Sequence, residues 1–202
     1  MNLGTKVLLW SDTWATFALG MIGPIYAIFV EQIGGDILDA GWAYFAFMMT
    51  SGIVMYLLSK WENGVKHKEK LVVAGYSLTT IGCMSYFFVS DQVGLVITQV
   101  ILGLAGAVLV PAFDALYSDY VEKKKEAFQW GSYEAMQFIM TALAAVAGAY
   151  VASVFGFKAL FVFMFGVSLF SVFNSLNLVR KQQFLIGDMA SRAKAYKRMR
   201  KR

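Results

Sequence analysis

The chain has few of the residues that build disulfides, metal sites and soluble active sites. Its 202 residues include one cysteine, Cys83, and one histidine, His67, which lies in a charged segment. A single cysteine can form neither an internal disulfide nor a thiolate metal site. The sequence also has no phosphate-binding loop, zinc-ligand spacing, Gly-x-Ser-x-Gly or dinucleotide fingerprint. We therefore predict that the protein is not an enzyme and that it carries no cofactor and no metal.

Charged residues are also scarce. They make up 15% of the chain and hydrophobic residues make up 58%, against about 25% and 45–50% in soluble domains. The mean hydropathy is +0.58. This composition predicts an all-α integral membrane protein whose main partner is the lipid bilayer.

Long apolar runs divide the chain into six expected membrane spans. About 20 apolar residues cross the hydrocarbon core as a helix, and six stretches qualify: about 7–30, 38–59, 71–89, 93–117, 127–154 and 158–179. The first run is too long for a cleavable signal peptide and lacks a small-residue cleavage pattern, so we expect it to remain as an anchor. Residues 1–180 are thus predicted to form one transmembrane domain.

The basic residues alternate between the predicted connections. The amino-terminal end, the second and fourth connections and the segment after residue 178 carry 17 of the 18 lysines and arginines. Because basic residues favour the cytoplasmic side, both termini are predicted to be cytoplasmic, in a cell membrane. Lys60 and the triplet Lys123, Lys124 and Lys125 are then charges of cytoplasmic connections.

The segment 181–202 differs from the spans. Leu185, Met189 and Ala193 recur at three- and four-residue spacing, with basic residues at other positions. This pattern predicts a basic amphipathic cytoplasmic tail on an anionic leaflet rather than a nucleic-acid-binding segment.

Two short patterns recur in the two halves of the span set. Leu19-Gly20-x-x-Gly23 in the first span is matched by Leu102-Gly103-x-x-Gly106 in the fourth. An odd number of spans in each half gives the two triplets opposite orientations, as an inverted repeat requires. We therefore expect a 3+3 inverted repeat.

Three stretches resemble one family of transporters. The run TFALGMIGPIYAIFVEQIGG resembles the first span of a major facilitator superfamily (MFS) transporter. QVILGLAGAVLVPAFDALYSDY resembles the fourth span, and ALAAVAGAYVASVFGFKALF resembles the end of the fifth and the start of the sixth. The resemblance covers about residues 7–180 and implies one six-span half of the usual twelve, with the pathway lined by the first and fourth spans.

The sequence departs from the motifs of that family. MYLLSKWENGVKHK stands where the family usually has G-x-x-x-D-R-x-G-R, and Gln99-x-x-x-Gly103 stands where R-x-x-x-G is common. Uniport and proton coupling therefore both stay open. In the fifth span, Ala144-x-x-x-Gly148-x-x-x-Ala152 replaces a glycine-proline motif and predicts close helix packing.

Three acidic residues lie inside the predicted spans. Asp12, Asp114 and Glu134 come from three different spans, each roughly 5–11 Å below the cytoplasmic interface at 1.5 Å per residue. Charged residues in spans are costly and usually face protein or water. Two interpretations of these three acids stay open. They line a path for a cation or proton, or they form ion pairs with Lys60 or the lysine triplet that hold the helix ends together.

Other polar side chains complete the candidate substrate or cation pathway. Gln137 shares a helical face with Glu134, Gln99 could line a cavity or bridge helices, and Tyr26 lies beside Pro24 at mid-depth.

The sequence supports two functions. The first is a half-length MFS-like transporter that moves a small solute by alternating access as a parallel homodimer, because cytoplasmic termini make two copies parallel. The alternative is a non-transporting membrane partner subunit that pairs with another half-length chain. A cavity lined by the first and fourth spans favours transport, and acids capped by lysines favour the alternative.

Overall fold

All regular secondary structure in the part that the structure describes is helical. The computed structural model describes the backbone of residues 3–122 and 124–199 and the side chains of residues 4–122 and 124–180. Lys123 of the predicted triplet lies outside the described residues. The elements are α1 (Leu3–Gly20), η1 (Gly23–Ile25), α2 (Tyr26–Gln32), α3 (Ile37–Asn63), α4 (Lys68–Ser85), η2 (Tyr86–Phe88), α5 (Gln92–Tyr120) and α6 (Glu126–Met199).

Five of the helical stretches are long and apolar enough to cross a membrane. They are Gly4–Gln32, Ile37–Asn63, Lys68–Phe88, Gln92–Tyr120 and Glu126–Arg180. The first four each contain or largely match one predicted span. The last covers both remaining predicted spans, so the count of six stays a prediction.

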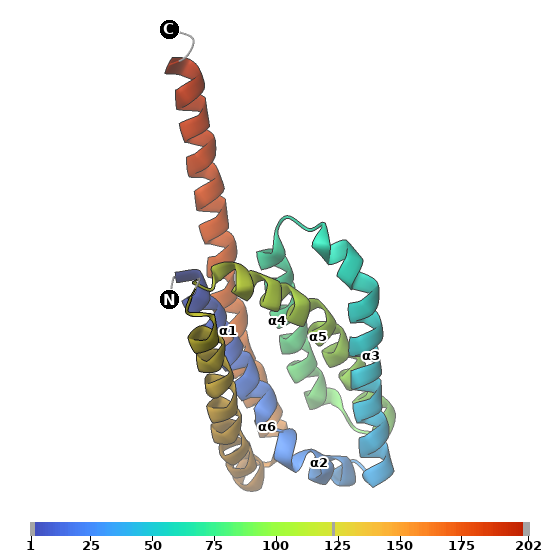
Figure 1. The fold of residues 1–202 in the computed structure, drawn as a ribbon. Coiled ribbons are helices and arrows are strands. Elements are labelled where there is room, and N and C mark those ends of the chain that lie inside the picture. Colours follow the sequence, from blue (N-terminus) through green and yellow to red (C-terminus); the bar gives the residue numbers. More distant parts are fainter. Residues whose placement is uncertain (1–2, 123, 200–202) are drawn as a thin grey trace.

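The helix α6 is divided at Gly156. The backbone there has φ 81° and ψ 169°, a conformation that residues with a Cβ rarely adopt. Figure 1 shows the chain reversing direction at the end of the first segment and returning along the bundle. The two segments, 126–155 and 157–199, therefore lie in the same bundle.

The first apolar stretch is broken near its middle. Helix α1 ends at Gly20, and Pro24 sits in the one-turn η1 before α2 begins at Tyr26. Proline has no backbone N–H to donate and disrupts a continuing helix. The α2 segment turns across the end of the bundle toward α3 (Figure 1).

Aspartates begin two of the long helices. The Asp36 carboxylate accepts from the backbone N–H groups of Leu38 at 2.8 Å and Asp39 at 2.9 Å. Asp39 returns the interaction by accepting from the N–H of Asp36 at 2.9 Å. Asp91 accepts from the N–H of Gly94 at 2.7 Å at the start of α5. These carboxylates satisfy N–H groups that have no partner within the helix.

Helix α1 packs between the two segments of α6. Gly20 lies against Ala144 and Thr141 of the first segment, and Trp14 contacts Phe170 of the second segment with ring centroids 5.5 Å apart. Gly148 faces the backbone of Met21 without room for a side chain. The close packing predicted from Ala144 and Gly148 is thus present.

Both ends of the chain lie at one end of the bundle. Figure 1 shows the amino terminus, the α3–α4 connection and the α5–α6 connection together there, and α6 extends past them to its end at Met199. The α2–α3 connection, the α4–α5 connection and Gly156 lie at the other end (Figure 1).

Large apolar side chains cover the outer surface of two segments. On α3, Tyr56 is 76% exposed, and on the first segment of α6, Phe138 is 74% exposed. Such a surface is stable against lipid or against another protein chain. The residues that face inward form two apolar clusters, one around Phe29 and Tyr86 and one around Tyr76 and Tyr117.

Candidate functional site

Asp12 lies where three helices meet. Its carboxylate accepts hydrogen bonds from the hydroxyl of Tyr76 on α4 at 3.1 Å and the hydroxyl of Tyr133 on α6 at 3.0 Å. The side-chain amide of Gln137 donates to the same oxygen as Tyr133. Gln137 is itself bonded to the hydroxyl of Thr16, one turn further along α1. This network ties α1 to α4 and to the first segment of α6.

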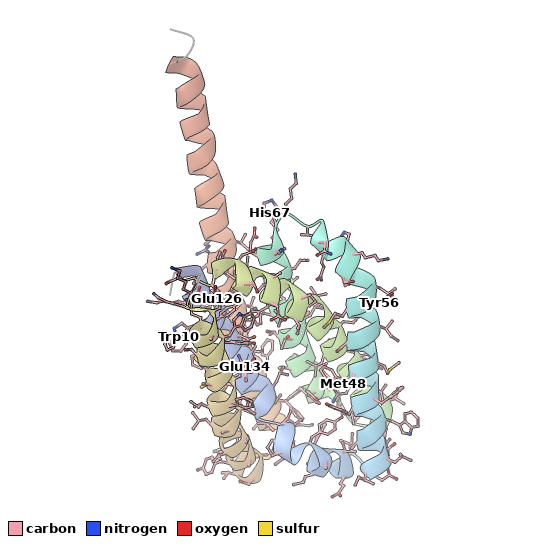
Figure 2. The ribbon with its side chains drawn as sticks, in the orientation of Figure 1. Trp10, Met48, Tyr56, His67, Glu126 and Glu134 are labelled. Atoms are coloured by element: carbon pink, nitrogen blue, oxygen red, sulfur yellow. The ribbon has the colours of Figure 1, made fainter. Side chains whose placement is uncertain are left out.

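Asp114 and Glu134 lie beside this network on exposed surface. Both side chains are exposed, and their carboxylates are close enough to repel each other. Asp114 also interacts electrostatically with Asp12. Figure 2 places Glu134 further along α6 than Glu126, toward the middle of the bundle. Asp114 therefore lies near both Asp12 and Glu134, and the common depth of the three acids in a membrane stays a prediction.

The predicted lysine partners lie elsewhere. Among the described residues, no ion pair joins Asp12, Asp114 or Glu134 to a lysine. The Lys125 ammonium instead lies 2.8 Å from Glu122 within the α5–α6 connection. The hydrogen bond from Lys125 lowers the pKa of that carboxyl. Lys60 and Lys124 are exposed, so the braces expected from these charges are not formed within the described part of the chain.

Gln99 and Tyr26 form a second polar site. The side-chain amide of Gln99 on α5 donates to the hydroxyl of Tyr26 on α2 at 2.8 Å and to that of Tyr86 on η2 at 3.1 Å. Gln99 and Tyr86 are buried, 6% and 2% exposed. Three elements thus place an amide and two hydroxyls at one point.

These three side chains line a cavity of about 450 Å³. Its other walls are mostly apolar and come from α1, α3, α4 and α5; they include Leu19, Tyr44, Phe47, Thr79, Leu102 and Leu109. Ligand sites in proteins commonly combine an apolar lining with a few convergent polar groups. The cavity therefore suits a small organic molecule with an apolar body and one polar group.

Sequence reasoning missed the tyrosines that complete both sites. Tyr76, Tyr86 and Tyr133 are hydrogen-bond donors or acceptors at the two networks. One signal was available, because Tyr133 precedes Gln137 by four residues and such pairs share a helical face. The described residues contain no group of three or more histidine, cysteine, aspartate or glutamate side chains placed to hold a metal ion.

The sequence of the chain is similar to those of known membrane transporters. The family model of the Major Facilitator Superfamily matches residues 13–185. This range begins within α1 and ends at Leu185 in the second segment of α6. The chain belongs to the major facilitator superfamily. The members of this superfamily are membrane transporters, and the helices apolar enough to span a membrane agree with that.

Relatives within the superfamily come from bacteria and an archaeon. The MFS-type transporter YitZ of Bacillus subtilis is 23% identical over 145 residues, which are 72% of this chain and 88% of YitZ. The multidrug resistance protein MdtG of Salmonella dublin is 25% identical over 174 residues, 84% of this chain and 43% of MdtG. The MFS-type transporter MJ1560 of Methanocaldococcus jannaschii is 21% identical over 157 residues, 77% of this chain and 40% of MJ1560. The chain thus spans most of YitZ but less than half of the other two.

Proposed function

We propose that the chain is one six-helix unit of an MFS transporter that moves a small solute by alternating access between two parallel units. The observation that carries this proposal is the cavity around Gln99, lined by α1, η1, α2, α3, α4, η2 and α5. Residues of the first and fourth apolar stretches line this cavity. The resemblance to the superfamily places these two stretches along the pathway. Transport between two units would place the solute where this cavity opens.

Six crossings in a 3+3 inverted arrangement are supported by two helix contacts. The turn at Gly156 divides α6 into two segments that are each long enough to cross a membrane. Gly20 of α1 lies against the first segment of α6, and Gly103 of α5 lies against Phe47 and Thr50 of α3. The two glycines of the repeated pattern thus make equivalent close crossings, each with the middle helix of the other triplet.

Cytoplasmic termini are part of the proposal. The amino terminus, the two lysine-rich connections and the extension of α6 lie at one end of the bundle (Figure 1). In the sequence, the amino-terminal end, these two connections and the segment after residue 178 carry 17 of the 18 lysines and arginines, a distribution that favours the cytoplasmic side. The basic segment 181–202 would then meet the inner leaflet of the cell membrane.

The second unit is proposed to be another copy of this chain. A different half-length chain in that place would give a heterodimer of the same architecture. Exposed apolar residues on α3 and on the first segment of α6 leave room for a partner. Cytoplasmic termini would make the two copies parallel, so a two-fold axis along the membrane normal would relate them.

The solute is proposed to be a small organic molecule. The cavity volume of about 450 Å³ lies within the range of drug-sized sites, roughly 300–1,000 Å³. The relative MdtG is named a multidrug resistance protein, and an aromatic and aliphatic lining suits such compounds. Asp114 and Glu134, both exposed and without a lysine partner among the described residues, would attract a cationic solute or a coupling cation.

Replacing Gln99 by leucine is expected to reduce transport about fivefold, because the cavity loses its amide while keeping its volume, and one hydrogen bond to a polar solute group is worth about 1 kcal/mol. The measurement is uptake of amphipathic organic cations, ethidium first, into proteoliposomes. Thr98→Val is the matched control, since Thr98 is equally buried on α5 but does not line the cavity. Uptake that stays at the level of protein-free liposomes for every solute would favour the non-transporting partner subunit.

Replacing Glu134 by glutamine is expected to abolish the pH dependence of uptake if Glu134 carries the coupling proton. Asp114 on α5 and Tyr133 on α6 are its charged and titratable neighbours, and Asp114 in turn interacts with Asp12 on α1. Uptake is measured as a function of external pH with the internal pH fixed. An unchanged pH profile would refute this role for Glu134 and leave Asp12 and Asp114 to be tested in the same way.

A further inference from the structure

A second cavity lies at the end of α3, apart from the Gln99 site. It has a volume of about 160 Å³ and is bounded by the last turn of α3, the first turn of α4 and the middle of α5. Its polar wall consists of Ser59, Glu62, Asn63 and Lys68, and its apolar wall includes Leu71 and Pro111. It lies at the same end of the bundle as the α3–α4 connection that carries His67 (Figure 2).

The carboxylate of Glu62 in this cavity lacks a partner. Glu62 is 7% exposed, and its Oε1 atom has no hydrogen-bond donor within the described part of the chain. A buried carboxylate without a partner is costly, so such groups are normally paired with a cation or a donor. The cavity therefore presents one unneutralised acceptor.

The lysine on the cavity wall does not neutralise it. The Lys68 ammonium lies 4.0 Å from the carboxylate of Asp119 on α5, and no ion pair joins it to Glu62 among the residues described. The ammonium of Lys68 is directed to Asp119, so Glu62 has no lysine partner within the described part of the chain.

The remaining groups around Glu62 suit a small hard cation. The Ser59 hydroxyl donates its proton to the backbone oxygen of Tyr56 at 2.8 Å, which leaves the lone pairs of its oxygen free. Asn63 lines the same cavity and carries a neutral amide oxygen, and α3 ends at Asn63, where the helix dipole is negative. Hard cations prefer oxygen ligands of this kind.

We propose that this cavity binds one monovalent inorganic cation of the Na⁺ class, with Glu62 as its charged ligand. One carboxylate with neutral oxygens matches a single positive charge, whereas divalent sites usually have several carboxylates. A volume of about 160 Å³ has room for the ion with several waters, at about 30 Å³ for each water. The bound ion would link the end of α3 to α5 beside Pro111. This site does not depend on the proposed transport.

The test is binding of ²²Na⁺ to the purified chain in choline chloride, at constant ionic strength. We expect saturable binding of one ion for each chain, and apparent affinity at least about tenfold weaker in Glu62→Gln. Glu31→Gln is the matched control, because Glu31 is an exposed acid of α2 outside this cavity, and its binding should equal that of the wild type. Ser59→Ala and Asn63→Ala keep the carboxylate and should each weaken ²²Na⁺ binding less than Glu62→Gln does. These two variants test the site if Glu62→Gln does not fold.

Two results would overturn the proposal. The first is ²²Na⁺ binding that is absent or that is equal in the wild type and Glu62→Gln. The second is displacement of ²²Na⁺ by methylammonium at lower concentration than by Na⁺ itself, which would assign the cavity to an ammonium group instead. Because no solute movement is measured, failure of this experiment leaves the transport proposal unaffected, and failure of uptake leaves the cation site unaffected.

Discussion

Replacing Asp12 by alanine is expected to lower the apparent unfolding midpoint of the protein in detergent by about 5–15 °C. The Asp12 carboxylate accepts hydrogen bonds from Tyr76 on α4 and from Tyr133 and Gln137 on α6. Its loss leaves these three donors without their acceptor. Tyr76 is fully buried, so water cannot replace the lost bond without rearrangement. Each buried donor left alone costs about 1–3 kcal/mol in water-soluble proteins and somewhat less in membrane bundles, and about 1 kcal/mol shifts the midpoint of a chain of this size by 2–4 °C.

The control for this prediction is Asp119→Asn. The Asp119 side chain is 66% exposed and lies 4.0 Å from Lys68, and exposed ion pairs of this kind contribute little. Its midpoint should stay within about 2 °C of the wild type, as followed by fluorescence-detected size-exclusion chromatography after heating. Equal midpoints for Asp12→Ala and Asp119→Asn would show that the Asp12 network does not hold α1 in the bundle.

Replacing Gly148 by alanine is expected to destabilise the packing of α1 against α6. A Cβ atom placed at Gly148 would lie 2.6 Å from the carbonyl carbon and 2.7 Å from the Cα of Met21, and closer still to the Met21 oxygen. These are backbone atoms, so the end of α1 must move away to admit one methyl group. Overpacking of this kind costs about 1–3 kcal/mol, which exceeds the gain of up to about 1 kcal/mol from helix propensity.

Gly131→Ala provides the matched comparison on the same segment of α6. A Cβ atom at Gly131 meets no atom within 4 Å, so this variant gains helix propensity without a clash. We expect its unfolding midpoint to equal or exceed that of the wild type while that of Gly148→Ala falls. A midpoint for Gly148→Ala at or above that of Gly131→Ala would contradict the close crossing of α1 and α6.

The sequence predicts the helical stretches well because their length and apolar content are local properties. Acids at the start of α3 and α5 supply the helix caps at Asp36 and Asp91, and these lie in the short polar segments that separate apolar runs. Gly156 marks the turn inside α6, in the segment that separates the fifth and sixth predicted spans. The small residues Ala144 and Gly148 mark the close crossing with α1.

The partners of the charged residues are harder to predict, because they depend on how each helix is rotated about its axis. Glu134 and Gln137 are three residues apart and were expected to share a face. The structure directs Gln137 to Asp12 and leaves Glu134 exposed. Tyr133 and Gln137, four residues apart, share the face toward α1 instead. Spacing gives the relative angle of two side chains, whereas tertiary packing decides which face is inside.

The proximity of the three acidic residues is the part of the site that residue counting indicates. Counting residues from the ends of their spans places Asp12, Asp114 and Glu134 at one level, which stays a prediction; in the structure Asp114 interacts electrostatically with Asp12 and with Glu134. The cavity at Gln99 and the cavity at Glu62 could not be predicted in this way. Each is formed by elements far apart in the sequence.

The central claim, that two six-helix units together form the transporter, is tested most directly by the mass of the protein in lipid nanodiscs. Native mass spectrometry at low protein load needs no knowledge of the solute. One chain has a mass of 22.4 kDa, and the account predicts a stable particle that contains two chains, with the ratio unchanged as the load is lowered. A single chain at every load would contradict the homodimer and direct the search to a different half-length partner.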